Sequence, residues 1–242
     1  MDKKSDIQQD VLKWNKRRIK KAERIFSIVQ GLISKQNGVI LDVGCHEGAM
    51  EEIFTKNKQK KIIGIDISLD TLKSAQLKFQ NGSKNIEFVN ADGLHLPFKK
   101  DVVECIICNH VIDYLEPKGQ LISEFMIVLK ENGYIYLAVI NMEFLKWYLR
   151  FPKFFKIIVG PFYGRVKPSF SSKFGTPEKY QFWQDVLSKR NRIKNSDITA
   201  NIILKNDKNI LKETTSGKIL RKILSKISPS WVFIAMKSQT EI

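Results

Sequence analysis

The chain has 242 residues, of which 43% are hydrophobic, 27% charged and 10% aromatic. This balance excludes a disordered, collagen-like or coiled-coil protein, and no uninterrupted apolar run approaches the roughly 20 residues of a membrane-spanning helix. The net charge of +16 is uneven, because residues 1–140 hold 21 basic and 18 acidic side chains whereas residues 141–242 hold 20 and 7. We expect the C-terminal part to face something anionic, with a solvated lysine-rich surface as the alternative.

Strands and helices alternate along the first 140 residues. Residues 5–34 have helical periodicity and predict one long helix or two shorter ones. The apolar runs that predict strands are 39–43, 61–67, 86–89, 102–108 and 134–140, and the segments with helical periodicity between them are 49–54, 68–79 and 120–129. Parallel neighbours need crossover helices that bury an apolar stripe, so this order predicts an α/β fold with a doubly wound, mostly parallel sheet. Ligands of such sheets bind beyond the carboxyl ends of the strands.

The pattern changes after residue 140. Aromatic and basic residues interleave over 144–167, broken by Pro152, Pro161 and Pro168, which predicts an insertion after the fifth strand. A helix at 176–187 and two closing strands at 198–204 and 231–236 follow. We expect a single domain: an N-terminal helical cover (1–34), a ligand-binding core (35–140), a substrate-side insertion or lid (141–190) and closing strands (191–242).

Three cysteines and the start of the chain bear on location and redox chemistry. Cys45, Cys105 and Cys108 suggest no disulfide framework, and Met1 is followed by charged residues rather than an apolar signal core. The CxxC of Cys105 and Cys108 lies in an apolar, strand-like run, which favours packing over metal or redox use. The sequence predicts a cytoplasmic protein with no bound metal.

Acidic side chains occur at the ends of three successive predicted strands. Gly44 allows a tight turn after the first strand, which contains Asp42, and Gly48 permits a close approach at the start of the next helix. Asp66, at the tip of the second strand, is placed to accept hydrogen bonds from two ribose hydroxyls, and Asp92, after the third, to accept from the exocyclic amine of adenine. Any one acid alone is more often a cap or a solvated residue, but three in succession predict a nucleoside site.

These residues resemble the class I S-adenosylmethionine-dependent methyltransferases. The resemblance covers residues 35–140 and is carried by LDVGCHEG, IIGIDIS, NADGLHLPF with VVECIICNHVIDYL, and LKENGYIYLAV, four segments in the order of that family. The segment HLPFKKDVVECIICNHVIDYLEP looks like the type 11 branch, which methylates small molecules. The resemblance implies a Rossmann-like methyltransferase fold with a seven-stranded sheet, and S-adenosylmethionine as cofactor.

The resemblance also implies a set of cofactor-binding residues, with two departures from the family pattern. His46 stands where the loop has its middle glycine, and Tyr114 stands where this branch has a histidine. Glu47 in the turn would repel a dinucleotide pyrophosphate but suits a cationic sulfonium and an α-ammonium group, which disfavours a dehydrogenase. The expected cofactor-binding residues are Asp42, Gly44, Cys45, His46, Glu47, Gly48, Asp66, Ile67, Asp92, Gly93 and Asn109.

The reaction implied is an in-line displacement in which an acceptor oxygen, nitrogen or carbon attacks the methyl group and S-adenosylhomocysteine leaves. His110 follows the fourth strand and is expected to act as a general base or to contact the substrate, with a structural hydrogen bond as the alternative. The expected acceptor-binding residues are His110, Asp113, Tyr114, Trp147 and Tyr148.

The aromatic and basic insertion leaves the acceptor open. We rank first a lid over a small-molecule, lipid or lipid-linked/glycan acceptor. This lid would also contact the inner face of an anionic membrane peripherally. An RNA acceptor, tRNA or rRNA, ranks second because it would depend on charge alone. A cofactor-fold protein that binds without catalysis is the third hypothesis.

Overall fold

The structure is a computed structural model that describes residues 3–33, 38–54, 60–80, 84–140, 150, 193–200 and 230–237. The chain divides into two compact units, Met1–Cys108 with Ser123–Ile135 and Asn109–Ile122 with Tyr136–Ile242. The predicted helix at 176–187 and the insertion residues Trp147 and Tyr148 lie outside the described residues. The four-part division of the chain stays a prediction.

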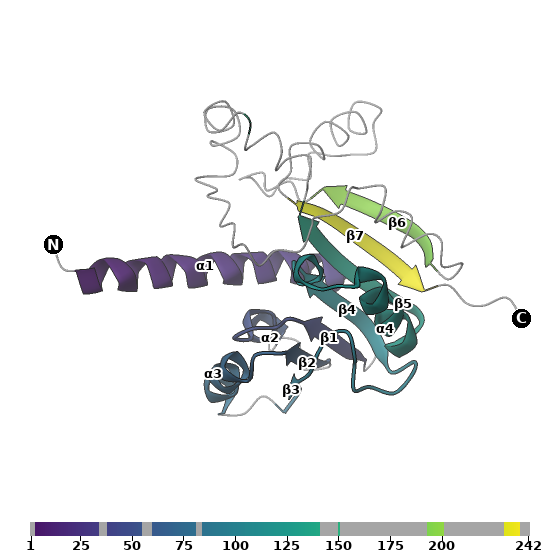
Figure 1. Cartoon of the computed structure of the whole chain (residues 1–242), viewed down its shortest axis with the longest axis horizontal. Coiled ribbons are helices and arrows are strands. Elements are labelled where there is room, and N and C mark those ends of the chain that lie inside the picture. Colours follow the sequence, from purple (N-terminus) through teal and green to yellow (C-terminus); the bar gives the residue numbers. More distant parts are fainter. Residues whose placement is uncertain are drawn as a thin grey trace, which may run out of the picture. The chain divides into compact units, whose positions relative to one another are not determined.

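The N-terminal segment forms one long helix, α1 (Lys3–Val29) (Figure 1). Ala22, Ile25 and Val29 recur at helical spacing and are buried. On the same part of the helix, the ring of Phe26 meets that of Phe54, in α2 (Ala49–Phe54), edge to face at a centroid distance of 4.7 Å. This apolar contact docks the C-terminal half of α1 on α2.

Four parallel strands form the centre of the first unit. They are β1 (Val39–Val43), β2 (Lys61–Asp66), β3 (Ile86–Asn90) and β4 (Val103–Asn109). β1 pairs with β2 and β4, and β2 pairs with β3, all in parallel. β1 and β4 are almost entirely apolar and buried, as expected for strands covered on both faces. The predicted strands agree with these bounds to within one residue at each end.

The helix α3 (Leu69–Phe79) begins where the sequence predicts it. Ser68 is its N-cap, and the Ser68 hydroxyl accepts a hydrogen bond from the Thr71 amide at 3.4 Å. Asp70 lies in the first turn, where a carboxylate is favoured by the helix dipole.

The next helix and strand differ from the prediction. The sequence also predicts that Asn132 and Gly133 close this helix. In the structure α4 (Lys118–Val128) is followed at once by β5 (Leu129–Ile140), and both residues lie inside the strand. Gly133 is needed for another reason: a Cβ atom there would lie 2.9 Å from the Glu104 carbonyl oxygen. The glycine permits a close approach between backbones rather than a helix cap. A short 3-10 helix, η1 (Ile112–Tyr114), was not predicted.

The strand order is β3-β2-β1-β4-β5-β7-β6. β7 (Ser230–Lys237) and β6 (Ile193–Ala200) form an antiparallel pair (Figure 1). β7 matches the second predicted closing strand, whereas β6 begins five residues before the first. Its polar start is held by pairing with β7, in which Ile193 lies opposite Lys237, and such pairing leaves no apolar signal in the sequence. The prediction of a mostly parallel α/β sheet is confirmed.

The described residues offer no candidate for a membrane-spanning helix or for metal binding. None of the helices described combines the length and apolar character that crossing a membrane requires. Within the same residues, no three His, Cys, Asp or Glu side chains are grouped so that they could hold a metal ion. Cys45, Cys105 and Cys108 are buried and form no disulfide, in agreement with a packing role.

Candidate functional site

The loop between β1 and α2 has left-handed backbone at alternate positions. Gly44, His46 and Gly48 have φ angles of 75°, 52° and 76°. The amides of Gly44 and Cys45 both donate to the Ile65 carbonyl, at 2.8 and 3.0 Å, which ties the loop to β2. His46 therefore adopts the conformation that a glycine takes at this place, and histidine is among the residues that tolerate it. The departure from the family pattern at His46 leaves the shape of the loop intact.

Gly48 is required by space as well as by backbone conformation. A Cβ atom there would lie 2.8 Å from Cε2 of Phe79 and 3.1 Å from Cζ of Phe88. These rings pack against each other with centroids 5.6 Å apart. The start of α2 therefore lies against the aromatic pair, as the sequence predicts for a close approach.

Asp66 joins the end of β2 to the glycine loop. Its Oδ2 accepts from the His46 amide at 3.0 Å, and its Oδ1 accepts from the Ser68 amide at 2.9 Å. The Asn90 side chain donates to the carbonyls of Asp66 and Ile67, at 2.9 and 3.0 Å, so β3 holds the same strand end. A carboxylate has about four lone-pair sites, so each Asp66 oxygen can also accept from a ribose hydroxyl.

Three further predicted residues, Ile67, Asp92 and Gly93, lie just after β2 and β3 in the sequence. Ile67 is 73% exposed, an unusual degree of exposure for an isoleucine and one that suits an apolar ligand surface. Oδ1 of Asp92 accepts from the Leu94 amide at 2.9 Å, and Oδ2 lies 3.7 Å from the ring of the exposed His95. Asp92 and the adjoining Gly93 are partly exposed, as a ligand contact requires.

Two carboxyl groups are buried in this part of the fold. Burial, then the charge of Asp66, raises the pKa of Asp42 from 3.8 to about 7. Burial, then the charge of Asp42, raises the pKa of Glu51 well above its usual 4.5. Both Glu51 oxygens are buried and have no hydrogen-bond partner within the described part of the chain. The sequence analysis missed Glu51, because on α2 it has the pattern of a solvated helix residue.

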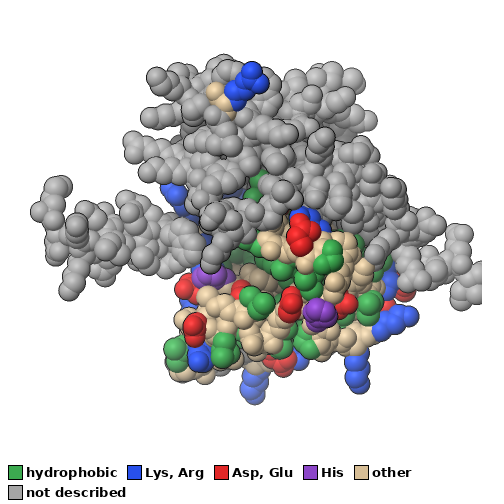
Figure 2. All heavy atoms as spheres, viewed as in Figure 1, with side chains coloured by type: hydrophobic (Ala, Val, Ile, Leu, Met, Phe, Trp, Pro, Cys, Tyr) green, Lys and Arg blue, Asp and Glu red, His purple; other side chains and the backbone are tan. Residues whose placement is uncertain are grey.

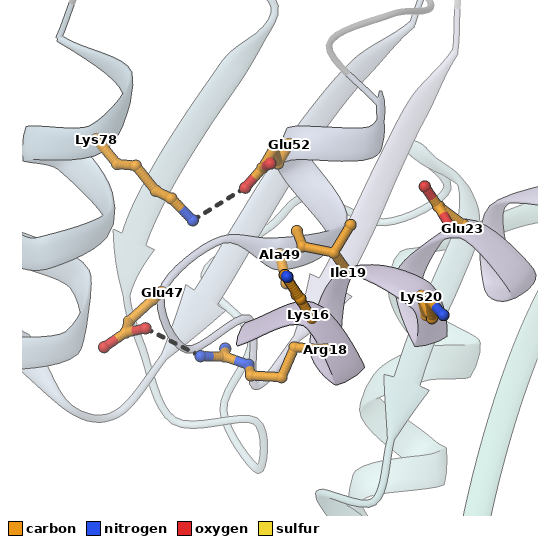
Figure 3. A pocket seen from close by; sticks show the side chains of 9 residues that line it. All are labelled: Lys16, Arg18, Ile19, Lys20, Glu23, Glu47, Ala49, Glu52 and Lys78. Carbon is orange, nitrogen blue, oxygen red and sulfur yellow. Dashed lines mark hydrogen bonds and ion pairs between the residues drawn. The ribbon is translucent and has the colours of Figure 1, made fainter. Parts of the chain in front are cut away.

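Glu47 is paired with a residue that the sequence analysis also missed. Nη1 of Arg18, on α1, lies 3.0 Å from Oε2 of Glu47 (Figure 3). The two side chains line a cavity of about 450 Å³ together with Ala49, Glu52 and Lys78, and Lys78 pairs with Glu52 at 3.0 Å. Arg18 was overlooked because it lies in a run of basic residues, which is usually a solvated helix face.

The second unit carries the predicted acceptor residues that lie within the described chain. Nδ1 of His110 lies 3.4 Å from Oδ2 of Asp113, and the Asp113 oxygens each accept from the Ile140 amide at 3.2 Å. His110 has a left-handed φ of 61°, and its amide donates to the Ala138 carbonyl at 2.9 Å. Asp113 is thus a buried carboxylate that can hold an imidazole in one orientation.

Asn109 and Tyr114 flank this pair in the sequence. Asn109 ends β4, and its Oδ1 is buried with no hydrogen-bond partner among the described residues. Tyr114 is 50% exposed, and burial of its hydroxyl, followed by the Asp113 charge, raises its pKa above 10. Trp147 and Tyr148, the remaining predicted acceptor contacts, lie outside the described residues.

The first unit fits S-adenosylmethionine. Asp66 has spare acceptor capacity beside an exposed isoleucine, which matches a ribose next to an adenine. Glu47 and Arg18 offer one charge of each sign beside the loop, which matches the zwitterionic amino-acid group of the cofactor. Asp42, whose pKa of about 7 leaves it partly ionised near neutral pH, favours a ligand that brings positive charge. The strand order and this loop agree with the class I methyltransferase fold that the sequence predicts.

Comparison with known proteins agrees. Residues 41–137 match a family described as a methyltransferase domain, of type 11. A relative is the ubiquinone/menaquinone biosynthesis C-methyltransferase UbiE of Wigglesworthia glossinidia brevipalpis, 29% identical over 66% of this chain and 68% of its own. An uncharacterized protein of Methanocaldococcus jannaschii is 30% identical over 51% of this chain and 50% of its own. The chain spans between half and about two thirds of the length of these two relatives.

A solved structure shares the fold. The S-adenosylmethionine-dependent methyltransferase from Archaeoglobus fulgidus has a TM-score of 0.60 and 16% identity, over 91% of this chain and 94% of its own. The Rossmann-like methyltransferase fold predicted from the sequence is therefore confirmed, and residues 41–137 are similar to the methyltransferase-domain family. The roles of the individual site residues stay predictions.

Proposed function

We propose that this protein transfers the methyl group of S-adenosylmethionine to a small-molecule acceptor, including a lipid or lipid-linked one. The observation that carries the proposal is the link made by Asp66, whose carboxylate holds the glycine loop through His46 and the start of α3 through Ser68. This link supports the role of Asp66 as a ribose acceptor, beside a loop that holds the amino-acid end of the same ligand. When bound, S-adenosylmethionine supplies an activated methyl group, so positioning and exclusion of water are the main tasks of the protein.

Different residues of the first unit bind different parts of the cofactor. Asp66 accepts from the ribose hydroxyls and Asp92 from the adenine amine, while Ile67 contacts the adenine ring. The amides of the Gly44–Gly48 loop and the carboxylate of Glu47 hold the methionine part. Asp42 lies beneath the loop and favours the positive charge of the sulfonium.

His110 removes a proton from the acceptor, and Asp113 orients its imidazole. When His110 carries its proton on Nδ1, Asp113, 3.4 Å away, accepts from it, which leaves Nε2 as the proton acceptor. A base of this kind is needed when the attacking atom must lose a proton, as in a hydroxyl group or an acidic carbon. The pair therefore supports an acceptor of that chemistry over one that is already a free nucleophile.

A small-molecule acceptor has the stronger support. The relative named UbiE is a C-methyltransferase of ubiquinone and menaquinone biosynthesis, which favours a small-molecule acceptor. On the face seen in Figure 2, acidic and basic side chains of the described residues are interspersed, so the described part of that face offers no continuous basic track for RNA. The basic excess of the chain lies in residues 141–242, and RNA as acceptor would depend on that charge alone.

The acceptor class is tested by incubating the protein with methyl-labelled S-adenosylmethionine and a fractionated cell extract. We expect label in the lipid or small-molecule fractions. Label confined to RNA would replace our proposal with the RNA alternative. Calorimetric binding of S-adenosylmethionine without label in any fraction would favour a non-catalytic binding protein.

Contact with a membrane is tested separately. We expect the protein to sediment with anionic liposomes at low salt, because the 144–167 segment combines aromatic and basic residues. Sedimentation should weaken as salt is raised. No sedimentation, together with tight tRNA binding, would reverse the ranking of the two acceptor classes.

A further inference from the structure

Arg18 is held beside the glycine loop by the packing of α1. Ala22, one turn after Arg18, is buried, and Phe26, two turns after it, packs on Phe54 of α2. Positions i, i+4 and i+8 share one face of a helix. The face of α1 that packs on α2 therefore includes Arg18. The Arg18 side chain reaches Glu47 in the glycine loop (Figure 3).

The exposure of Arg18 sets it apart from its basic neighbours. Its side chain is 20% exposed, whereas Lys16, Arg17 and Lys20 are classed as exposed residues. An anionic partner stabilises a guanidinium that has lost much of its water, because an unpaired charge away from water is unfavourable. In this structure Glu47 is one such partner, and its side chain is 41% exposed to solvent.

The surroundings of Arg18 are acidic. Its charge lowers the pKa of Asp42 and of Glu51 against the larger effect of their burial, and it helps to lower the pKa of His46. The guanidinium field therefore reaches both the loop and the acids beneath it. Without a cation here, Glu47 and the ionised fraction of Asp42 would repel any ligand that brings a carboxylate of its own.

S-adenosylmethionine brings such a carboxylate, beside an α-ammonium group. Resting on the assignment of the glycine loop to this cofactor, we infer that Arg18 binds the α-carboxylate of S-adenosylmethionine while Glu47 pairs with its α-ammonium group. A guanidinium offers a planar fork of donors that matches a carboxylate, and two opposite charges 3.0 Å apart match the charge pattern of the amino-acid group. The helix α1 is then part of the cofactor site rather than only a cover.

Lys78 is a competing cation in the same cavity, which Lys16 and Lys20 of α1 also line. It pairs with Glu52 at 3.0 Å, and Figure 3 shows it reaching Glu52 from α3, on the other side of the cavity from Arg18. A matched control on α1 is Arg24, which has the same side chain on an exposed position of the same helix. Replacing each residue separately distinguishes a ligand contact from a general loss of positive charge.

The test is isothermal titration calorimetry of the full chain with two ligands, S-adenosylhomocysteine and 5′-methylthioadenosine, which lacks the amino-acid group. We expect Arg18→Ala to weaken S-adenosylhomocysteine about 10- to 100-fold and to leave 5′-methylthioadenosine unchanged. Arg24→Ala and Lys78→Ala should bind both ligands like the wild type. Glu47→Gln should weaken S-adenosylhomocysteine alone, by a smaller factor.

Three outcomes would overturn the inference. Unchanged binding of S-adenosylhomocysteine by Arg18→Ala removes the contact, and an equal loss for both ligands means that Arg18 supports the loop and not the carboxylate. A specific loss in Lys78→Ala instead assigns the carboxylate to Lys78. If the wild type binds neither ligand, the cofactor assignment itself fails, which separates that failure from a failure at Arg18.

Discussion

The glycine loop and the His110–Asp113 pair are built in different ways. The loop depends on backbone: three left-handed residues, two amides on one carbonyl, and a carboxylate that accepts two further amides. The His110–Asp113 pair depends on side chains, one of them buried and anchored by a distant amide, that of Ile140. A backbone requirement restricts which residues can occupy a position, whereas a side-chain pair can be replaced by many others. This difference explains why a cofactor is easier to infer from a sequence than an acceptor.

The largest effect is expected at His110. If the pair acts on the acceptor, His110→Gln should lower kcat about 100-fold or more and leave the Kd of S-adenosylhomocysteine unchanged. Asp113→Asn should lower kcat less and alter the pH profile, because it disturbs the orientation of the imidazole. Rates against pH with the labelled acceptor fraction provide the measurement. His95→Gln, at an exposed loop histidine, is the control, and full activity in His110→Gln would leave the histidine with a structural role.

At Asp66 we expect the affinity for the ligand to fall. Asp66→Ala should weaken S-adenosylhomocysteine roughly 100-fold, since it removes a ribose acceptor and releases the amides of His46 and Ser68. Asp70→Ala, an exposed carboxylate four residues later, should bind normally. Calorimetry measures the affinity for S-adenosylhomocysteine, and wild-type affinity in Asp66→Ala would contradict the assignment of the site.

Stability should respond to a methyl group at Gly48. Gly48→Ala should lower the free energy of unfolding by about 2 kcal/mol, because the backbone is left-handed and the Cβ atom meets Phe79 and Phe88. Gly119→Ala, on α4, has nothing within 4 Å of its added Cβ and should be neutral or slightly stabilising. Urea unfolding of the two variants measures the difference. Equal values would show that the loop relaxes around the aromatic pair.

The smallest effect is expected at Glu51 and depends on pH. The pKa of Glu51 is raised in the folded protein, so the folded state binds more protons than the unfolded state above pH 4.5 and stability is lost as pH rises. Glu51→Gln should therefore stabilise the protein by about 1–2 kcal/mol at pH 8 and change little at pH 4. Thermal unfolding at both values tests this, with Glu52→Gln, on the exposed side of α2, as the control. A gain of the same size at both pH values would contradict the ionisation argument.

The sequence predicted the first four strands and the loop well because their signals are local. Short apolar runs between turn residues define β1 to β4, and Gly44 and Gly48 each have a steric reason that a sequence preserves. The boundary between α4 and β5 was wrong because Gly133 serves a contact with Glu104, far away in the sequence. The start of β6 was missed for a similar reason, since pairing with β7 holds a polar segment in the sheet.

The same limit applied within the site. Asp66 was predicted as a ligand contact, but its bond to the His46 amide depends on the fold and could not be foreseen. Arg18 and Glu51 were missed because a charged residue on a helix is most often solvated, and only the docking of α1 and α2 distinguishes them. Long-range packing supplied the information that periodicity and spacing lack.

The two hydrogen bonds of Asp66 have a further consequence for affinity. They fix the glycine loop and the ends of β2 and α3 during folding, before any ligand arrives. Binding then loses little conformational entropy in this region, so more of the contact energy appears as affinity. The site is preorganised, and a cofactor can bind tightly at the open edge of a sheet without a large rearrangement of the loop.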